Sequence, residues 1–189
     1  MGMLSRAELE RMGFASIGLG VQVSDKASFH GASRISLGNH VRIDDFCVLS
    51  AGAGGIRIGD YVHVAVYSSL IGAAVIEVGD FANVSSRVAI YSSSDDFSGS
   101  AMTNPTVSAE FTSVAQAPVY VGRHAVIGAG CVVLPGVRIG EGAAVGALSL
   151  VKRDCEEFTI YAGTPARAIG SRSRQLLELE QRFLASLRG

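Results

Sequence analysis

The chain has 189 residues and carries 16 basic against 17 acidic side chains, a net charge of −1. This balance argues against a general nucleic-acid binder or a protein of anionic membrane surfaces, because both usually carry an excess of basic residues. Hydrophobic residues make up 48% of the chain and charged residues 17%, which excludes a mainly disordered protein.

Three further features of the composition narrow the class. No apolar run approaches the roughly 20 residues of a membrane-spanning helix, and the N-terminus lacks the apolar core of a signal peptide, so we expect a cytoplasmic protein. Three cysteines without a CxxC pair predict neither a disulfide framework nor a zinc site. With 23 glycines, no tryptophan and 7% aromatic residues, the chain is expected to form narrow repeated layers.

The first 16 residues differ in pattern from the rest of the chain. Residues 3–14 have the pattern of a short amphipathic helix, which we expect to cap one end of the fold. From residue 17 an aliphatic or aromatic side chain recurs every six positions, and a small or β-branched residue lies two positions before most of them. The first series is Ile17, Val23, Phe29 and Ile35, with Val21, Ala27 and Ser33 as its small positions.

The repeat is most regular in the C-terminal half. There the aliphatic positions are Val121, Ile127, Val133, Ile139, Val145 and Val151. A period of six with three hexapeptides per coil is typical of a parallel β-helix of triangular section, and it keeps no single face of an α-helix. The sequence therefore predicts an all-β solenoid over residues 17–170.

Two segments interrupt or follow the repeat. Residues 91–118 form a polar loop between series that otherwise join tightly, and a loop of this length in a regular fold indicates a function. Residues 171–189 place leucines and a phenylalanine at helical spacing. This pattern predicts a C-terminal helix that packs on the last coil or on a neighbouring subunit.

The last part of the repeat carries a family resemblance. The stretch VGRHAVIGAGCVVLPGVRIGEGAAVGALSLVKRD and the closing YAGTPARAIG at 161–170 resemble the acyl-CoA-binding end of the hexapeptide-repeat acyltransferases. The resemblance covers residues 17–170. It implies a left-handed parallel β-helix and a homotrimer with active sites in clefts between subunits. It also implies acyl-CoA as co-substrate, either acetyl-CoA or a short hydroxyacyl-CoA.

The loop segment IYSSSDDFSG is similar to two groups within this family. One group N-acylates nucleotide-linked amino-dideoxy sugars, and the other O-acetylates sugars of lipopolysaccharide or capsule. The resemblance implies an N-acyltransferase of surface-polysaccharide synthesis whose substrate is a sugar such as dTDP-4-amino-4,6-dideoxyglucose. A sugar O-acetyltransferase is the alternative, and a non-catalytic β-helix scaffold is the alternative from another class.

The choice between amine and hydroxyl depends on the catalytic base. Many O-acetyltransferases of this family use a histidine on the loop after a coil, and Asp95 takes that place here. A hydroxyl gains much from a base, whereas a neutral amine needs mainly an acceptor that orients it and takes its proton late. The resemblance implies Ser85 and Asp95, ten residues apart, as the catalytic pair. Ser86 and Asp96 have the same spacing and are the second choice.

Other interpretations of the polar residues stay open. A Ser-Asp-Asp run also fits a turn in which side chains cap local amides. We expect the loop to hold the sugar, with Tyr91, Ser94 and Asn104 as candidate contacts. His63 and His124 are the second choices for a base. The four histidines of the chain lack the clustered spacing of a metal site, so no metal cofactor is expected.

The resemblance also assigns the donor-binding residues. The backbone amides of Ala129 and Ala147 would meet the pantetheine arm, and one such amide would polarise the thioester carbonyl. Lys152 and Arg167 match the phosphate-contacting region of the family best. They belong to a basic cluster after the last coils that we expect to contain Lys152, Arg153, Arg167, Arg172 and Arg174.

Overall fold

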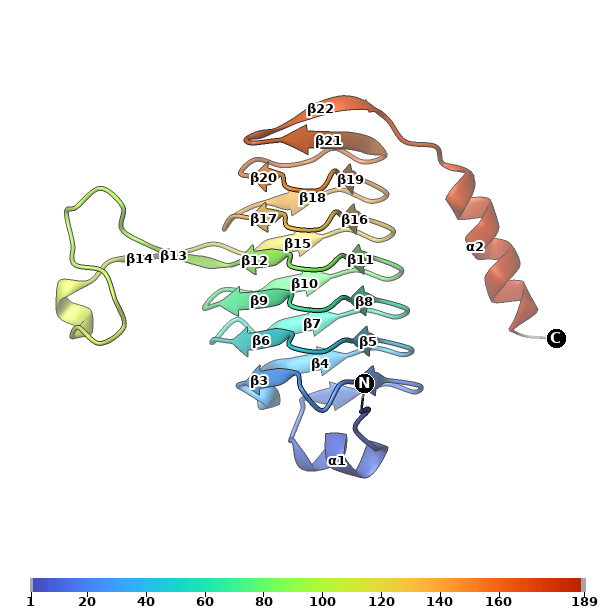
Figure 1. Ribbon diagram of the computed structural model, residues 1–189, viewed down its shortest axis with the longest axis horizontal. Coiled ribbons are helices and arrows are strands. Elements are labelled where there is room, and N and C mark those ends of the chain that lie inside the picture. Colours follow the sequence, from blue (N-terminus) through green and yellow to red (C-terminus); the bar gives the residue numbers. More distant parts are fainter. Residues whose placement is uncertain (1, 188–189) are drawn as a thin grey trace.

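The computed structural model describes residues 2–187 as a triangular solenoid with one projecting loop and one flanking helix (Figure 1). Each coil contributes a short strand to each of three walls, and strands of successive coils pair in parallel within a wall. The predicted left-handed parallel β-helix with one long loop and two short helices is confirmed.

The walls are defined by their strands. The first wall contains β1 (Ser16–Ile17), β4 (Ile35–Leu37), β7 (Ile56–Ile58), β10 (Ile76–Val78), β15 (Val119–Val121) and β18 (Arg138–Ile139). The second wall contains β2 (Gln22–Val23), β5 (Arg42–Ile43), β8 (His63–Val64), β11 (Asn83–Val84), β16 (Val126–Ile127), β19 (Ala144–Val145), β21 (Thr159–Gly163) and β22 (Ala166–Ser171). The third wall contains β3 (Ser28–His30), β6 (Val48–Ala51), β9 (Ser69–Gly72), β12 (Ala89–Tyr91), β17 (Val132–Val133) and β20 (Leu150–Val151).

The hexapeptide period places one aliphatic side chain of each strand in a shared interior. Ile127 and Val133 are fully buried, as are the other aliphatic positions of the C-terminal series to within a few per cent. The small positions two residues earlier, such as Ala125 and Cys131, are buried beside them. Because the three walls approach closely, these positions have no room for larger side chains.

The first coil departs from the predicted pattern. Phe29 is only partly buried, and Ser33, predicted as an inward small position, is exposed in the short turn η1 (Ala32–Arg34). The prediction for Ser33 was wrong because the chain makes a 3₁₀ turn there, and this turn directs the residue outward instead of into the interior. Helix α1 (Arg6–Arg11) covers this end of the solenoid and buries Leu9.

The chain turns between walls at three edges, each named here for a feature on it. The helix edge joins the first and second walls, the serine edge joins the second and third, and the loop edge joins the third and first. On the helix edge His40, Tyr61, Phe81 and His124 turn the chain with φ between 54° and 58°. Bulky residues are uncommon in this left-handed region, so their recurrence here indicates that the rings themselves are needed.

These rings stack in parallel along the helix edge, with 4.7 Å between the centroids of His40 and Tyr61 and 5.0 Å between those of Tyr61 and Phe81. Helix α2 (Gln175–Ser186) runs back along this edge, and Phe183 meets the Tyr61 ring edge-on at 5.3 Å. The C-terminal helix therefore lies against earlier coils of its own chain (Figure 1). Its expected position on the last coil is corrected, because the exposed ring column offers it an apolar surface.

A buried carboxylate holds the same helix. Glu180 accepts a hydrogen bond from His124 Nε2 at 2.8 Å and pairs with the guanidinium of Arg123, while its side chain is only 5% exposed. The Arg123 guanidinium also lies 5.7 Å from the centroid of the Phe81 ring. Charge and apolar contact thus act together at the helix edge.

The long loop begins with an ordered stem. Strands β13 (Ser93–Asp95) and β14 (Val114–Gln116) pair antiparallel, and the turn η2 (Ala109–Phe111) lies beyond them. Figure 1 shows this stem projecting from the body on the side opposite α2. Strands β10 and β15 pair in register across the excursion, so the coils continue as if the loop were absent.

The C-terminal end of the second wall is closed by a hairpin. Strand β22 folds back antiparallel on β21 after residue 163. Both helices of the described chain, residues 2–187, are too short and too polar to cross a membrane.

We expect Glu180→Gln to lower the free energy of unfolding by about 1–3 kcal/mol, because it leaves Arg123 and His124 without their shared carboxylate. Thermal unfolding should report the loss, and limited proteolysis should release α2 first. Glu178→Gln is the matched control, since Glu178 is exposed on the same helix. Equal loss from both variants would show that the buried contact does not hold α2.

Candidate active site

Ser85, Ala129 and Ala147, which the sequence singled out, lie on the serine edge in three successive coils. Ser85, Gly128 and Gly146 follow the second-wall strands of successive coils, and each of their backbone amides donates to a carbonyl of the next coil. Ala129 and Ala147 come directly after the glycines and are exposed. Ser85, Ala129 and Ala147 therefore share one edge of the solenoid.

In the two coils that follow Ser85, the backbone of this edge has amide groups available to a ligand. In the part of the chain that the structure describes, the amide N–H groups of Ala129 and Ala147 have no hydrogen-bond partner. A side chain on Gly128 would bring its Cβ within 2.5 Å of the Ala147 nitrogen, so glycine is needed for the close approach of the coils. An extended molecule with amide groups can pair with both free N–H groups as an added strand would.

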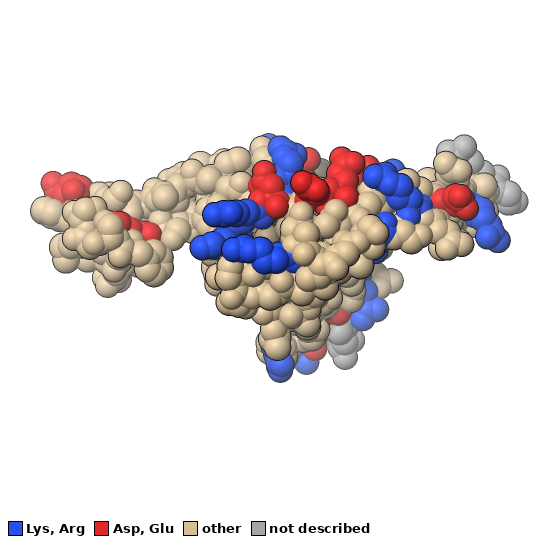
Figure 2. Space-filling view, turned by 90° about the horizontal axis from the view of Figure 1, so that it is seen from above, with Lys and Arg blue, Asp and Glu red and all other residues tan. Residues whose placement is uncertain are grey.

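A basic hollow lies beside the last coil. It has a volume of about 210 Å³ and is lined by the cations Lys152, Arg153 and Arg167 and by one carboxylate, Asp154. Figure 2, which views the molecule from this end, shows blue side chains on the part of the body that faces the loop. The three cations outnumber this carboxylate, which also accepts a hydrogen bond from the Arg138 amide, so the hollow fits a phosphate group.

Two members of the predicted basic cluster lie elsewhere, so that prediction is corrected. Arg172 donates from Nη1 to the carbonyl oxygens of His124 at 2.9 Å and Gly142 at 3.0 Å, which ties the end of β22 to the helix edge. Arg174 places its guanidinium 3.9 Å from the centroid of the Phe158 ring. Both side chains are used in packing because the chain turns away after β22 to begin α2.

A second hollow lies at the base of the loop. Its volume is about 280 Å³, and Tyr91, Ser94 and Asp95 line it together with Phe97 and Leu134. Its wall is therefore polar on the side of β13 and apolar on the side of the next coil. Three sequence-predicted residues are brought together here.

Two other predicted loop residues are not part of this hollow. The Asn104 side chain accepts hydrogen bonds from the amide and hydroxyl of Thr106 at 2.9 and 2.8 Å, which forms a turn at the exposed part of the loop. Asp96 accepts hydrogen bonds from Ser98 and Ser100 and from the amide of Ala101, and those from Ser98 and Ala101 lower its pKa most. These side chains act in turns, which was the other interpretation of the Ser-Asp-Asp run.

Ser85 and Asp95 lie on different edges of the solenoid. Ser85 follows β11 on the serine edge, and Asp95 lies on β13, which leaves the body at the loop edge. The whole width of the third wall separates these two edges. No hydrogen bond joins the two side chains within residues 2–187.

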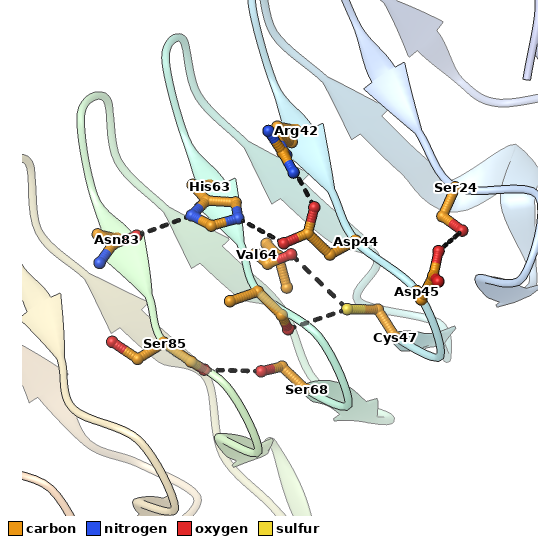
Figure 3. Close-up of polar contacts among 11 residues, drawn as sticks. Ser24, Arg42, Asp44, Asp45, Cys47, His63, Val64, Ser68, Asn83 and Ser85 are labelled. Carbon is orange, nitrogen blue, oxygen red and sulfur yellow. Dashed lines mark hydrogen bonds and ion pairs between the residues drawn. The ribbon is translucent and has the colours of Figure 1, made fainter. Parts of the chain in front are cut away.

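The second wall carries a polar network that the sequence analysis missed (Figure 3). His63 Nε2 lies 2.8 Å from Asp44 Oδ2, and its Nδ1 lies 3.2 Å from Asn83 Oδ1. Arg42 Nε donates to the other Asp44 oxygen at 2.8 Å. Burial opposes ionisation of Asp44, but the hydrogen bonds from His63 and Arg42 lower its pKa below the ordinary value. Positions 42, 63 and 83 are one coil apart, and that spacing was the available signal.

This network bears on the two second-choice bases. Both ring nitrogens of His63 already have polar partners. His124 is bonded to Glu180 beneath α2, and burial lowers its pKa. His63 therefore has no open ring nitrogen for a substrate, and Nε2 of His124 is held by Glu180 beneath α2. Across residues 2–187 no group of three metal-ligating side chains is placed to hold an ion.

Known proteins resemble this chain both in sequence and in fold. A family model described as bacterial transferase hexapeptide (six repeats) matches residues 118–153. The dTDP-4-amino-4,6-dideoxy-D-glucose acyltransferase of Escherichia coli is 54% identical over 189 residues, which cover 100% of this chain and 98% of that protein.

Solved structures of AntD, an N-acyltransferase from Bacillus cereus, share the whole architecture. Its complex with dTDP and 3-hydroxybutyryl-CoA has a TM-score of 0.94 and 44% identity, and the match covers 99% of this chain and 98% of AntD. A serine-to-cysteine variant of AntD in complex with dTDP-4-amino-4,6-dideoxyglucose and coenzyme A has a TM-score of 0.92 and 45% identity, with 97% of each chain covered.

Because Arg167 lines the basic hollow and Arg174 packs on Phe158, the two arginines give a test of whether this hollow binds coenzyme A. Arg167→Ala should weaken coenzyme A binding about tenfold, because a charge-assisted phosphate contact is lost, while Arg174→Ala should leave it nearly unchanged. Isothermal calorimetry with coenzyme A measures both. If Arg174→Ala weakens binding as much as Arg167→Ala, the hollow beside the last coil is not the phosphate site.

Proposed function

Because the chain belongs to the hexapeptide-repeat acyltransferases, we propose that it transfers an acyl group from acyl-CoA to the amine of dTDP-4-amino-4,6-dideoxy-D-glucose. The observation that carries this proposal is the 54% identity, over the whole chain, to the Escherichia coli acyltransferase named for that sugar. Nucleotide-linked amino sugars and acyl-CoA as substrates agree with an enzyme of surface-polysaccharide synthesis in the cytoplasm.

The donor would lie along the C-terminal half of the serine edge. The phosphates of acyl-CoA would meet Lys152 and Arg167 in the basic hollow, and the pantetheine arm would pair with the free amides of Ala129 and Ala147. One of these amides would also stabilise the negative charge that develops on the thioester oxygen. The acyl group is acetyl or a short hydroxyacyl group; AntD has been solved with 3-hydroxybutyryl-CoA.

The acceptor amine would attack the thioester carbonyl carbon. A C–N bond forms, the C–S bond breaks, and coenzyme A leaves as the thiol after it takes up a proton. The proton that the amine loses would pass to the carboxylate of Asp95, and Ser85 would orient the amine. The polar partners of His63 support this choice, because both of its ring nitrogens are taken by Asp44 and Asn83, whereas Asp95 is exposed beside a hollow.

We further propose that the enzyme is a homotrimer with active sites between subunits. The separation of the serine edge from the loop edge supports this, because Ser85 of one copy can meet Asp95 only of a neighbour. Structures of AntD include variants at one serine and one aspartate that are also ten residues apart in that chain. In this arrangement the loop of one subunit would carry Asp95, Tyr91 and Ser94 to the serine edge of the next.

Substrate choice is tested by thiol release from acetyl-CoA and from 3-hydroxybutyryl-CoA. The acceptors are dTDP- and UDP-linked amino sugars and their hydroxyl analogues. We expect turnover with the dTDP-linked 4-amino sugar and at least a 100-fold lower rate with its hydroxyl analogue, because Asp95 takes the place of the histidine base from which a hydroxyl gains much. Comparable rates for both would favour the sugar O-acetyltransferase instead.

Shared active sites give a sharper test of Ser85 and Asp95. Asp95→Asn should lower kcat roughly 100-fold with a smaller change in KM for the sugar, and Ser85→Ala should lower it about tenfold. If the pair comes from two copies, a trimer that contains both variants has one intact site, so its activity should be about one third of wild type. Co-expression with two affinity tags isolates these mixed trimers.

The controls separate the possible outcomes. Mixed trimers of Ser85→Ala with Asp96→Asn should behave as Ser85→Ala trimers diluted with nearly active subunits, since Asp96 acts in a turn. Mixed Ser85→Ala and Asp95→Asn trimers no more active than the average of the two parents would place the pair within one chain. Full activity of Asp95→Asn would remove it as the proton acceptor.

A further inference from the structure

The serine edge carries a second column of stacked rings on its N-terminal half. Phe46 and Tyr67 turn the chain on successive coils with φ of 60° and 63°, and their rings stack with centroids 5.0 Å apart and 12° between planes. Asparagine or glycine would take this backbone conformation at lower cost. A pair of bulky rings there therefore needs a reason other than the turn.

The helix edge shows what such a column does when it is covered. There Phe183 of α2 packs edge-on against the rings of Tyr61 and Phe81. Within residues 2–187 nothing comparable covers the rings of the serine edge, and Phe46 is 45% and Tyr67 53% exposed. The same construction is thus buried by the chain itself on one edge and left open on the other.

Positive charge lies at both ends of the open ring pair. Arg87 turns the next coil and holds its guanidinium 5.9 Å from the centroid of the Tyr67 ring. No carboxylate pairs with Arg87 among residues 2–187. At the other end Lys26 lies 5.5 Å from the centroid of the Phe46 ring and 3.4 Å from a carboxylate oxygen of Asp45. Flat rings beside an unpaired arginine are complementary to a base joined to a diphosphate.

The position of this surface relative to the reacting centre points to the acceptor. Arg87 comes two residues after Ser85, and the ring pair continues the same edge toward the N-terminus. If acyl-CoA occupies the serine edge at Ala129 and Ala147, the N-terminal half of this edge remains for the second substrate. A nucleotide on the rings would place its sugar toward Ser85.

We propose that Phe46, Tyr67 and Arg87 bind the nucleoside diphosphate of the acceptor, with the base on the exposed rings and the diphosphate at Arg87. This inference rests on the proposed function, and it assigns the nucleotide to the body of one subunit. The loop hollow at Tyr91, Ser94 and Asp95 is then left to the sugar. A second copy packed on the rings is the competing occupant.

The test measures dTDP binding to the full-length protein by calorimetry, which is independent of turnover. Tyr67→Asn and Arg87→Asn should each weaken dTDP binding about tenfold and leave coenzyme A binding unchanged. Asparagine is chosen because it tolerates left-handed backbone, so both variants should fold. Phe111→Ala, an exposed ring of the loop, and Arg57→Gln, an exposed arginine of the first wall, are the matched controls.

Three results would overturn the inference. The first is unchanged dTDP affinity in both Tyr67→Asn and Arg87→Asn. The second is loss of affinity in Phe111→Ala alone, which would assign the nucleotide to the loop. The third is a changed molecular mass of Tyr67→Asn in light scattering, which would make the rings a contact between subunits. In each of these cases wild-type turnover with the dTDP-linked amino sugar would show that the proposed function stands.

Discussion

Backbone hydrogen bonds between successive coils determine where every functional group of this protein lies. From β2 to β21, each second-wall strand pairs in parallel with the next, for example Asn83 with His63 and Val126. Residues one coil apart in sequence therefore become neighbours in a straight column. The interior columns have to be aliphatic or small, but the columns at the edges are free to differ, and the chemistry of the protein is concentrated on them.

The three edges illustrate three uses of one geometry. The helix edge is closed by α2 through Phe183 and the buried Glu180. The loop edge releases the stem of β13 and β14. The serine edge stays open along its length, with free amides at Ala129 and Ala147 and exposed rings at Phe46 and Tyr67. Because the backbone is the same at each edge, these differences come from the side chains and from the segments that cover them.

The repeating part of the fold could be predicted from sequence because each coil repeats the same burial constraint. Val121 and its successors follow a fixed spacing, and so do Ala129 and Ala147. The ring columns were harder to predict, since left-handed backbone at Tyr61 or Tyr67 leaves no mark in hydrophobic periodicity. The distance between Ser85 and Asp95 depends on which edge each occupies. Arg172 shows a similar limit, because its role in packing appears only when β22 folds back.

The pairing of β10 with β15 across the loop has a consequence for how such enzymes diversify. A loop that leaves a parallel β-ladder and re-enters it in the same register does not change the alignment of residues in the coils before and after it. Its cost to folding is mainly the entropy of closing the excursion, which rises by only about 0.6 kcal/mol when the length doubles. Evolution can thus lengthen, shorten or replace this segment almost independently of the solenoid, while the serine edge keeps its spacing.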